Sequence, residues 1–171
     1  MKRIAIAAVA ALVLALPATA SAVILVGESI DGIKLGQPMK HVRKRLGKPS
    51  SIPAPDREWV YGELHVTFDS HRRVLSLSTT SAKQKTSKGI HSIQEIHKAI
   101  QPGTGSTEAE VRQAYPGIAC TPTGPPNDEM RCVLNSRYRG RVVETAFVIF
   151  DNPAIAVNGE VFYIEVDFPN E

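Results

Sequence analysis

The stretch Leu64–Asp69 reads LHVTFD, in which apolar and polar side chains alternate. A period of two is typical of a β-strand that has one buried and one solvated face. A counterpart, AFVIFD, occupies Ala146–Asp151 and ends in the same Phe-Asp pair. A further apolar strand is predicted after each copy, at Val74–Thr79 and at Glu160–Phe168. The two stretches therefore predict related strand pairs in the two halves of the chain.

The segments before these strands also correspond. Four positions match at a constant offset of 69: Gly36, Val42, Arg43 and Leu46 align with Gly105, Val111, Arg112 and Tyr115. This self-similarity predicts one supersecondary unit that is used twice. We assign the units to residues 23–82 and 89–171, and we assign residues 83–88 as the linker between them.

Each unit is predicted to contain helix followed by three antiparallel strands. In the first unit, apolar residues recur at helical spacing over Pro38–Leu46. In the second unit, two capping boxes, Ser92–Glu95 and Thr107–Glu110, each predict the start of a helix. Strands are predicted at Glu58–Tyr61, Leu64–Asp69, Val74–Thr79, Met130–Tyr138, Arg141–Asp151 and Glu160–Phe168. The expected fold class is α+β.

The first 22 residues have the pattern of a secretory signal peptide. Lys2 and Arg3 precede an uncharged apolar run, Pro17 interrupts that run, and Ala20-Ser21-Ala22 is a small-residue cleavage site. An uncleaved membrane anchor is the alternative, since the uncharged stretch continues to Val26 and could span a bilayer. With cleavage we expect a secreted or cell-envelope protein that has no stable membrane span.

The charge balance of the mature chain is close to neutral. Of the 20 Lys and Arg residues, Lys2 and Arg3 lie in the signal peptide, whereas all 17 Asp and Glu residues lie outside it, so the net charge is +1. Nucleic-acid binding requires a concentrated basic footprint and is not expected. Two local basic clusters are nevertheless present. They are Lys40, Arg43, Lys44, Arg45 and Lys48 on the first predicted helix, and Arg137, Arg139 and Arg141 near a predicted strand end.

These basic clusters have two interpretations. The first is a solvated helix face together with an edge strand that charge protects from aggregation. The second is contact with an anionic surface.

Cys120 and Cys132 are the only cysteines in the sequence. They flank a stretch rich in Pro and Gly, and export would place them where disulfides persist. We therefore predict a disulfide, with a metal site or a catalytic thiol as alternatives. No paired histidines at ligand spacing and no nucleophile elbow occur in the sequence, and we expect no cofactor, no metal site and no enzymatic activity.

The order of these motifs resembles the SmpA/OmlA-type repeat. The resemblance rests on a glycine before a capped helix, Val-Arg within that helix, a Trp-containing strand and two further strands that end in an aromatic residue and Asp. Tandem use in an exported chain with a disulfide after the repeat helix is similar to the β-lactamase inhibitory proteins. The resemblance implies two helix-helix-three-strand repeats that form one curved antiparallel sheet. Helices would cover one face of this sheet and the other would be open for protein contact.

The resulting hypothesis is a secreted protein-binding module, with a cell-envelope assembly factor and a small hydrolase as alternatives. The partner would be another protein, and the oligomeric state is left open. Strand alternation separates Leu64, Val66 and Phe68 from His65 and Thr67. Aromatic residues dominate binding hot spots. The predicted partner-binding residues are Trp59, Tyr61, His65, Thr67, Tyr138, Phe147, Tyr163 and Glu165. Trp59 and Phe147 could instead pack in the core.

Overall fold

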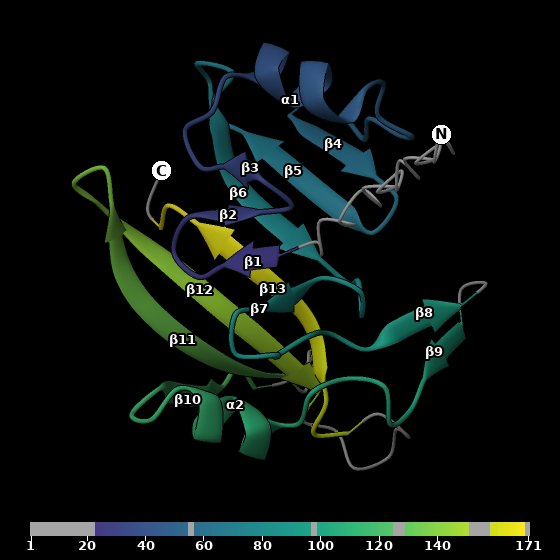
Figure 1. The fold of residues 1–171 in the computed structure, drawn as a ribbon, viewed down its shortest axis with the longest axis vertical. Helices are drawn as coiled ribbons and strands as arrows, with labels where there is room; N and C mark the ends of the chain where they lie inside the picture. The colour runs from purple at the N-terminus through teal and green to yellow at the C-terminus, as the bar shows by residue number, and fades with distance from the viewer. Residues whose placement is uncertain (1–22, 55–56, 97–98, 125–128, 151–157, 170–171) are drawn as a thin grey trace, which may run out of the picture.

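A seven-stranded antiparallel sheet forms the framework of the protein (Figure 1). The computed structural model describes residues 23–54, 57–96, 99–124, 129–150 and 158–169. Strand β6 of the first half pairs with β13 of the second half, so the two halves share this sheet. In sheet order the strands are β10 (Ala119–Pro122), β11 (Glu129–Tyr138), β12 (Arg141–Phe150), β13 (Val161–Asp167), β6 (Val74–Thr79), β5 (Leu64–Phe68) and β4 (Glu58–Tyr61).

A second, four-stranded sheet packs against one face of the large sheet. Its order is β3 (Ile33–Lys34), β2 (Ser29–Ile30), β1 (Val23–Leu25) and β7 (Lys85–Thr86), with β1 and β7 parallel. The turn between β1 and β2 touches the large sheet, because the Gly27 amide donates to Thr145 Oγ1 at 2.8 Å. A Cβ atom at Gly27 would lie only 2.0 Å from Ser136 Oγ. Glycine at this turn therefore allows the two sheets to approach.

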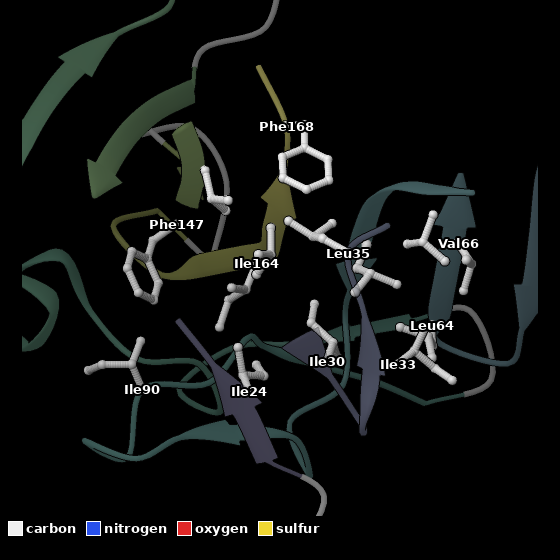
Figure 2. Close-up of a cluster of buried hydrophobic side chains, with 14 of the residues drawn as sticks. Ile24, Ile30, Ile33, Leu35, Leu64, Val66, Ile90, Phe147, Ile164 and Phe168 are labelled. Atoms are coloured by element: carbon white, nitrogen blue, oxygen red, sulfur yellow. The ribbon is translucent and has the colours of Figure 1, made fainter. Parts of the chain in front are cut away.

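The hydrophobic core lies between the two sheets. Ile24, Ile30 and Ile33 of the small sheet are fully buried and belong to the same cluster as Val66 and Ile164 of the large sheet (Figure 2). Two helices, α1 (Met39–Leu46) and α2 (Glu108–Ala114), lie beside β4–β5 and beside β10–β11, respectively (Figure 1). Each helix inserts one fully buried valine into the core. We call the covered side of the large sheet its core face.

The predicted fold class is wrong. The described residues form thirteen strands in two sheets and a separate hairpin, with two helices, and they do not form helix-helix-three-strand repeats. The core face is covered mainly by the small sheet, whereas the prediction placed helices there. The four strands of the small sheet were missed because each has only two or three residues, too few to show a period. One of them, β7, lies inside the predicted linker.

The first capping box of the second half was misleading. Instead of a helix, β8 (Gln94–Ile96) and β9 (Ala99–Gln101) form an antiparallel strand pair. The side chain of Ser92 is buried with no hydrogen-bond partner among the described residues, so it caps no helix. The amide of Ile93 instead donates to the Val161 carbonyl at 2.8 Å. A tertiary backbone bond thus outweighs the local helix signal in this segment.

Several local predictions are confirmed. The second capping box forms as predicted, with Thr107 and Glu110 bonding to each other's backbone amides. Helix α1 spans nearly the whole of its predicted range, and six strands fall within one or two residues of theirs. The disulfide joins Cys120 and Cys132, which are directly paired across β10 and β11. It therefore ties an edge strand of the large sheet to its neighbour.

The predicted signal peptide lies outside the described residues. Neither of the two described helices has the length and apolar character required to cross a membrane.

Candidate functional site

The second face of the large sheet is polar, and we call it the open face. Strand alternation separates it from the core face, where the small sheet, α1 and α2 are packed. Its side chains are mostly half-buried. By their register positions they are Glu58 and Val60 on β4, His65 and Thr67 on β5, Ser76 and Ser78 on β6, Tyr163, Glu165 and Asp167 on β13, Glu144, Ala146 and Val148 on β12, and Arg131, Val133 and Asn135 on β11.

The strand register aligns these residues in rows across the sheet. One row passes through directly paired residues from β4 to β11: Glu58, Thr67, Ser76, Asp167, Glu144 and Asn135. The neighbouring row places His65, Ser78 and Glu165 side by side. Directly paired side chains on one face lie close enough to interact. Residues far apart in the sequence thus form one continuous polar surface.

Arg131 is the centre of this surface. Its guanidinium donates to Glu144 Oε1 at 3.1 Å and to Glu165 Oε2 at 3.2 Å, so it bridges β12 and β13. The Ser76 hydroxyl donates to the other oxygen of Glu165 at 2.9 Å. The three charged side chains are 22–29% exposed. Partial burial and several charge-assisted hydrogen bonds hold their positions more firmly than an isolated surface ion pair would.

Asp167 lies beside this network without a comparable partner. Its Oδ1 atom is enclosed and has no hydrogen-bond partner among the described residues. Burial raises the pKa of Asp167 to about 6, and the negative charges of Glu165 and Glu144 add to this effect while Arg131 opposes it. Three carboxyl groups and one arginine thus interact electrostatically, and this patch retains negative charge near neutral pH.

Two further groups extend the patch along the sheet. Burial raises the pKa of the Tyr163 phenol, as do the nearby carboxylates of Glu165 and Glu129, so the hydroxyl remains protonated. Towards the β4 edge, His65 Nδ1 lies 2.5 Å from Glu58 Oε1, and both side chains are more than a third exposed. The open face therefore offers an aromatic side chain and both signs of charge.

The structure separates the predicted partner-binding residues into two groups. His65, Thr67, Tyr163 and Glu165 lie together on the open face. The other four lie on the core side. Phe147 is fully buried and stacks on Tyr115, Trp59 is 8% exposed and packs edge-on against Phe68, and Tyr61 and Tyr138 pack against the same core.

Sequence reasoning missed Arg131, Glu144, Ser76 and Asp167 as members of the site. A signal was present for Arg131 and Glu144, because charged residues interrupt otherwise apolar strand patterns at both positions. Their proximity, however, depends on the pairing of β11, β12 and β13, which the sequence does not specify. Aromatic residues were predicted as binding residues because they dominate binding hot spots, but most of the predicted ones pack in the core.

No metal centre emerges from the described residues, since no group of three or more His, Cys, Asp or Glu side chains is arranged to hold an ion. The expected absence of a cofactor and of enzymatic activity stays a prediction.

Comparisons with known proteins show a likeness of fold. The protein is similar to the crystal structure of YjgB, a DUF4309 family protein from Bacillus subtilis subsp. subtilis strain 168, with a TM-score of 0.54 and 14% sequence identity. The match covers 83% of this chain and 88% of YjgB. No protein-family model and no curated protein matches the sequence. The resemblance to SmpA/OmlA-type and β-lactamase inhibitory proteins stays a prediction.

Proposed function

We propose that this chain is an extracytoplasmic, non-enzymatic module that binds another protein through the open face of its large sheet. The observation that carries the proposal is the Arg131 network, in which Arg131, Glu144 and Glu165 hold one another in place on a face that the small sheet and the helices leave uncovered. Side chains that are already ordered lose little further entropy when a partner binds.

The composition of the face supports a protein partner. Tyr163 offers an aromatic side chain next to Arg131, and Tyr and Arg are enriched at binding hot spots. His65, Glu58 and Asp167 add polar groups around this centre, as in the polar rim of an interface. The disulfide supports an oxidising compartment, which agrees with the predicted export.

The test is capture of partners by the purified, oxidised mature chain, residues 23–171. The source is the secreted and surface fraction of the producing organism. Any captured protein is purified and its affinity is measured against the wild type and against Tyr163→Ala and Glu165→Gln. We expect each variant to weaken binding by about tenfold or more, as for hot-spot residues.

Gln113→Ala is the matched control, because Gln113 is exposed on α2, which packs on the core side. Equal binding by the wild type and both open-face variants would contradict the proposal. Turnover of a small substrate by the purified chain would favour the hydrolase alternative instead.

A further inference from the structure

Basic side chains from both halves of the chain meet at one groove. This groove has a volume of about 340 Å³ and is bounded by the connection between β3 and α1, the first turn of α1, and the turns after β5 and β11. Four of its lining residues are basic and none is acidic. We call it the basic groove, and its basic residues are Lys34, His41, Arg73 and Arg139.

The basic side chains of this groove come from distant parts of the sequence. His41 belongs to α1 and Arg139 to the turn between β11 and β12. His41 follows Lys40 of the first basic cluster and Arg139 belongs to the second, whereas the other members of both clusters do not line the groove. The convergence of four basic side chains on one concave surface favours contact with an anion.

Backbone hydrogen bonds fix the walls of the groove. The Gly36 amide donates to the Val74 carbonyl at 2.8 Å, and the Val74 amide donates back to Gln37 at 2.9 Å. The Met39 amide donates to the Arg72 carbonyl at 2.9 Å, which attaches the start of α1 to the turn after β5. Arg73 is oriented by a bond from its guanidinium to the Gly36 carbonyl at 3.2 Å. The groove is therefore formed before any ligand binds.

The two arginines of the groove have no ion-pair partner among the described residues. Lys34 is paired with Glu28 at 2.5 Å. No described carboxylate lies within ion-pair distance of His41, Arg73 or Arg139. Lys40 and Lys44 on the exposed side of α1 add to the same potential. Concave surfaces that carry charges of one sign concentrate counter-ions.

Arg139 occupies an unfavourable backbone conformation. Arg139 and Gly140 both have positive φ angles, 53° and 82°, as a two-residue type I′ hairpin turn requires. The equivalent turn between β2 and β3 uses Asp31 and Gly32, a favoured pair for this geometry. Arginine lacks the short polar side chain by which asparagine and aspartate stabilise the left-handed conformation through local hydrogen bonds. A strained residue at such a place is an indication of function.

We propose that the basic groove binds a phosphate group, either free or in a phosphate ester. Two guanidinium groups provide several N–H donors for the oxygens of a tetrahedral anion. A ligand with a single carboxylate carries less negative charge than a phosphate group and would use fewer of the basic side chains in the groove. The concave shape suits a single phosphate group or a narrow polymer better than it suits a flat membrane surface. This site lies apart from the open face and is independent of the function proposed above.

The test is a titration of the mature protein at constant ionic strength, followed by amide chemical shifts in NMR spectra. The probes are inorganic phosphate, a short poly(glycerol phosphate) and vesicles that contain an anionic phospholipid. We expect phosphate to shift the amide signals of residues 34–37, 39–41, 73 and 139, and the polymer to bind at the same residues. Binding of vesicles alone would overturn the proposal in favour of a membrane surface.

The decisive variant is Arg139→Asn. It removes the charge, and asparagine suits the left-handed turn better than arginine does, so the fold should be kept or stabilised. We expect phosphate affinity to fall about tenfold, and further in combination with Arg73→Gln, because charge-assisted hydrogen bonds are lost. Arg112→Gln on α2 removes an equal charge outside the groove and should leave affinity unchanged.

Equal losses in Arg139→Asn and Arg112→Gln would show a general charge effect and overturn the proposal. An absence of shifts at the groove with every probe would do the same. Tyr163→Ala on the open face should bind phosphate like the wild type, so failure of one proposal can be told apart from failure of the other.

Discussion

The two faces of the large sheet are made from the same strands but hold their side chains in different ways. On the core face, Val66, Leu77, Phe147 and Ile164 are completely buried against the small sheet and the helices. On the open face, Arg131 and its partners keep about a quarter of their surface exposed. Core-face side chains are held in place by packing against the small sheet and the helices, whereas open-face side chains are held by hydrogen bonds and ion pairs to one another.

This difference separates stability from recognition. Burial of apolar surface supplies most of the folding free energy, so the core face should tolerate little change. Half-buried ion pairs contribute much less to stability, but they fix the positions of groups that a partner can contact. Substitutions on the two faces should therefore differ in size and in pH dependence.

The largest effect is expected on the core face. Phe147→Ala removes a fully buried ring that stacks on Tyr115 at a centroid distance of 5.3 Å. The resulting cavity should lower the free energy of unfolding by about 4 kcal/mol. Urea denaturation followed by circular dichroism measures this change.

Tyr163→Ala is the control for this comparison, because it removes a half-buried ring from the open face. We expect a loss of about 1 kcal/mol there, since less apolar surface leaves solvent on folding. Similar losses for the two substitutions would contradict the division between the faces.

A smaller effect is expected at the centre of the open face. Arg131→Met leaves Glu144 and Glu165 half-buried without their shared cation. This should lower the free energy of unfolding by about 2 kcal/mol at pH 7, less than for a fully buried pair.

Combining Arg131→Met with Glu144→Gln and Glu165→Gln should restore most of the lost stability, because no uncompensated charge remains. If the triple variant is less stable than Arg131→Met alone, the polar network stabilises the fold directly, and the division between a stabilising core face and a recognising open face is wrong. Urea denaturation at pH 7 distinguishes the two results.

The smallest effect is expected at Asp167 and has the opposite sign. Its pKa is about 6 in the folded protein, above the ordinary value of 3.8. The folded state therefore holds its proton more tightly than the unfolded state, and stability falls as pH rises from about 4 through about 6. Asp167→Asn removes this loss and should raise the free energy of unfolding at pH 7 by about 1 kcal/mol, after allowance for solvent screening.

At pH 3.5 the aspartic acid is largely protonated in both states, so Asp167→Asn should have almost no effect. Urea denaturation at both pH values checks the sign. A stabilisation that is equal at the two values would show that the carboxylate charge is not its cause.

The strand predictions were successful where the pattern was long and periodic. The first five residues of LHVTFD form β5, with Leu64, Val66 and Phe68 buried as the alternation predicted. In the last strand, buried and half-buried residues alternate from Ile164 onwards, but Phe162 and Tyr163 are both half-buried, because the pairing of β12 with β13 is irregular near Ile149. A bulge of this kind shifts the faces by one residue and has no clear mark in the sequence.

The candidate site was only partly predictable. His65, Thr67, Tyr163 and Glu165 could be placed on a solvated face because alternation is a local property. Arg131, Glu144 and Ser76 could not be joined to them, since their contacts depend on which strands pair and in which register. The basic groove shows the same limit, because it brings His41 of α1 to Arg139 of a distant hairpin.

The sequence alone determined the long strands, both helices that form, the capping box at Thr107 and the disulfide between Cys120 and Cys132. These features depend on side chains a few positions apart or on the chemistry of a single pair. Only the tertiary structure decided the small sheet, the pairing of β8 with β9, and the faces on which Trp59 and Phe147 lie. Short segments carry too little local free energy to select a conformation, so they adopt the one that buries their side chains and pairs their backbone in the complete fold.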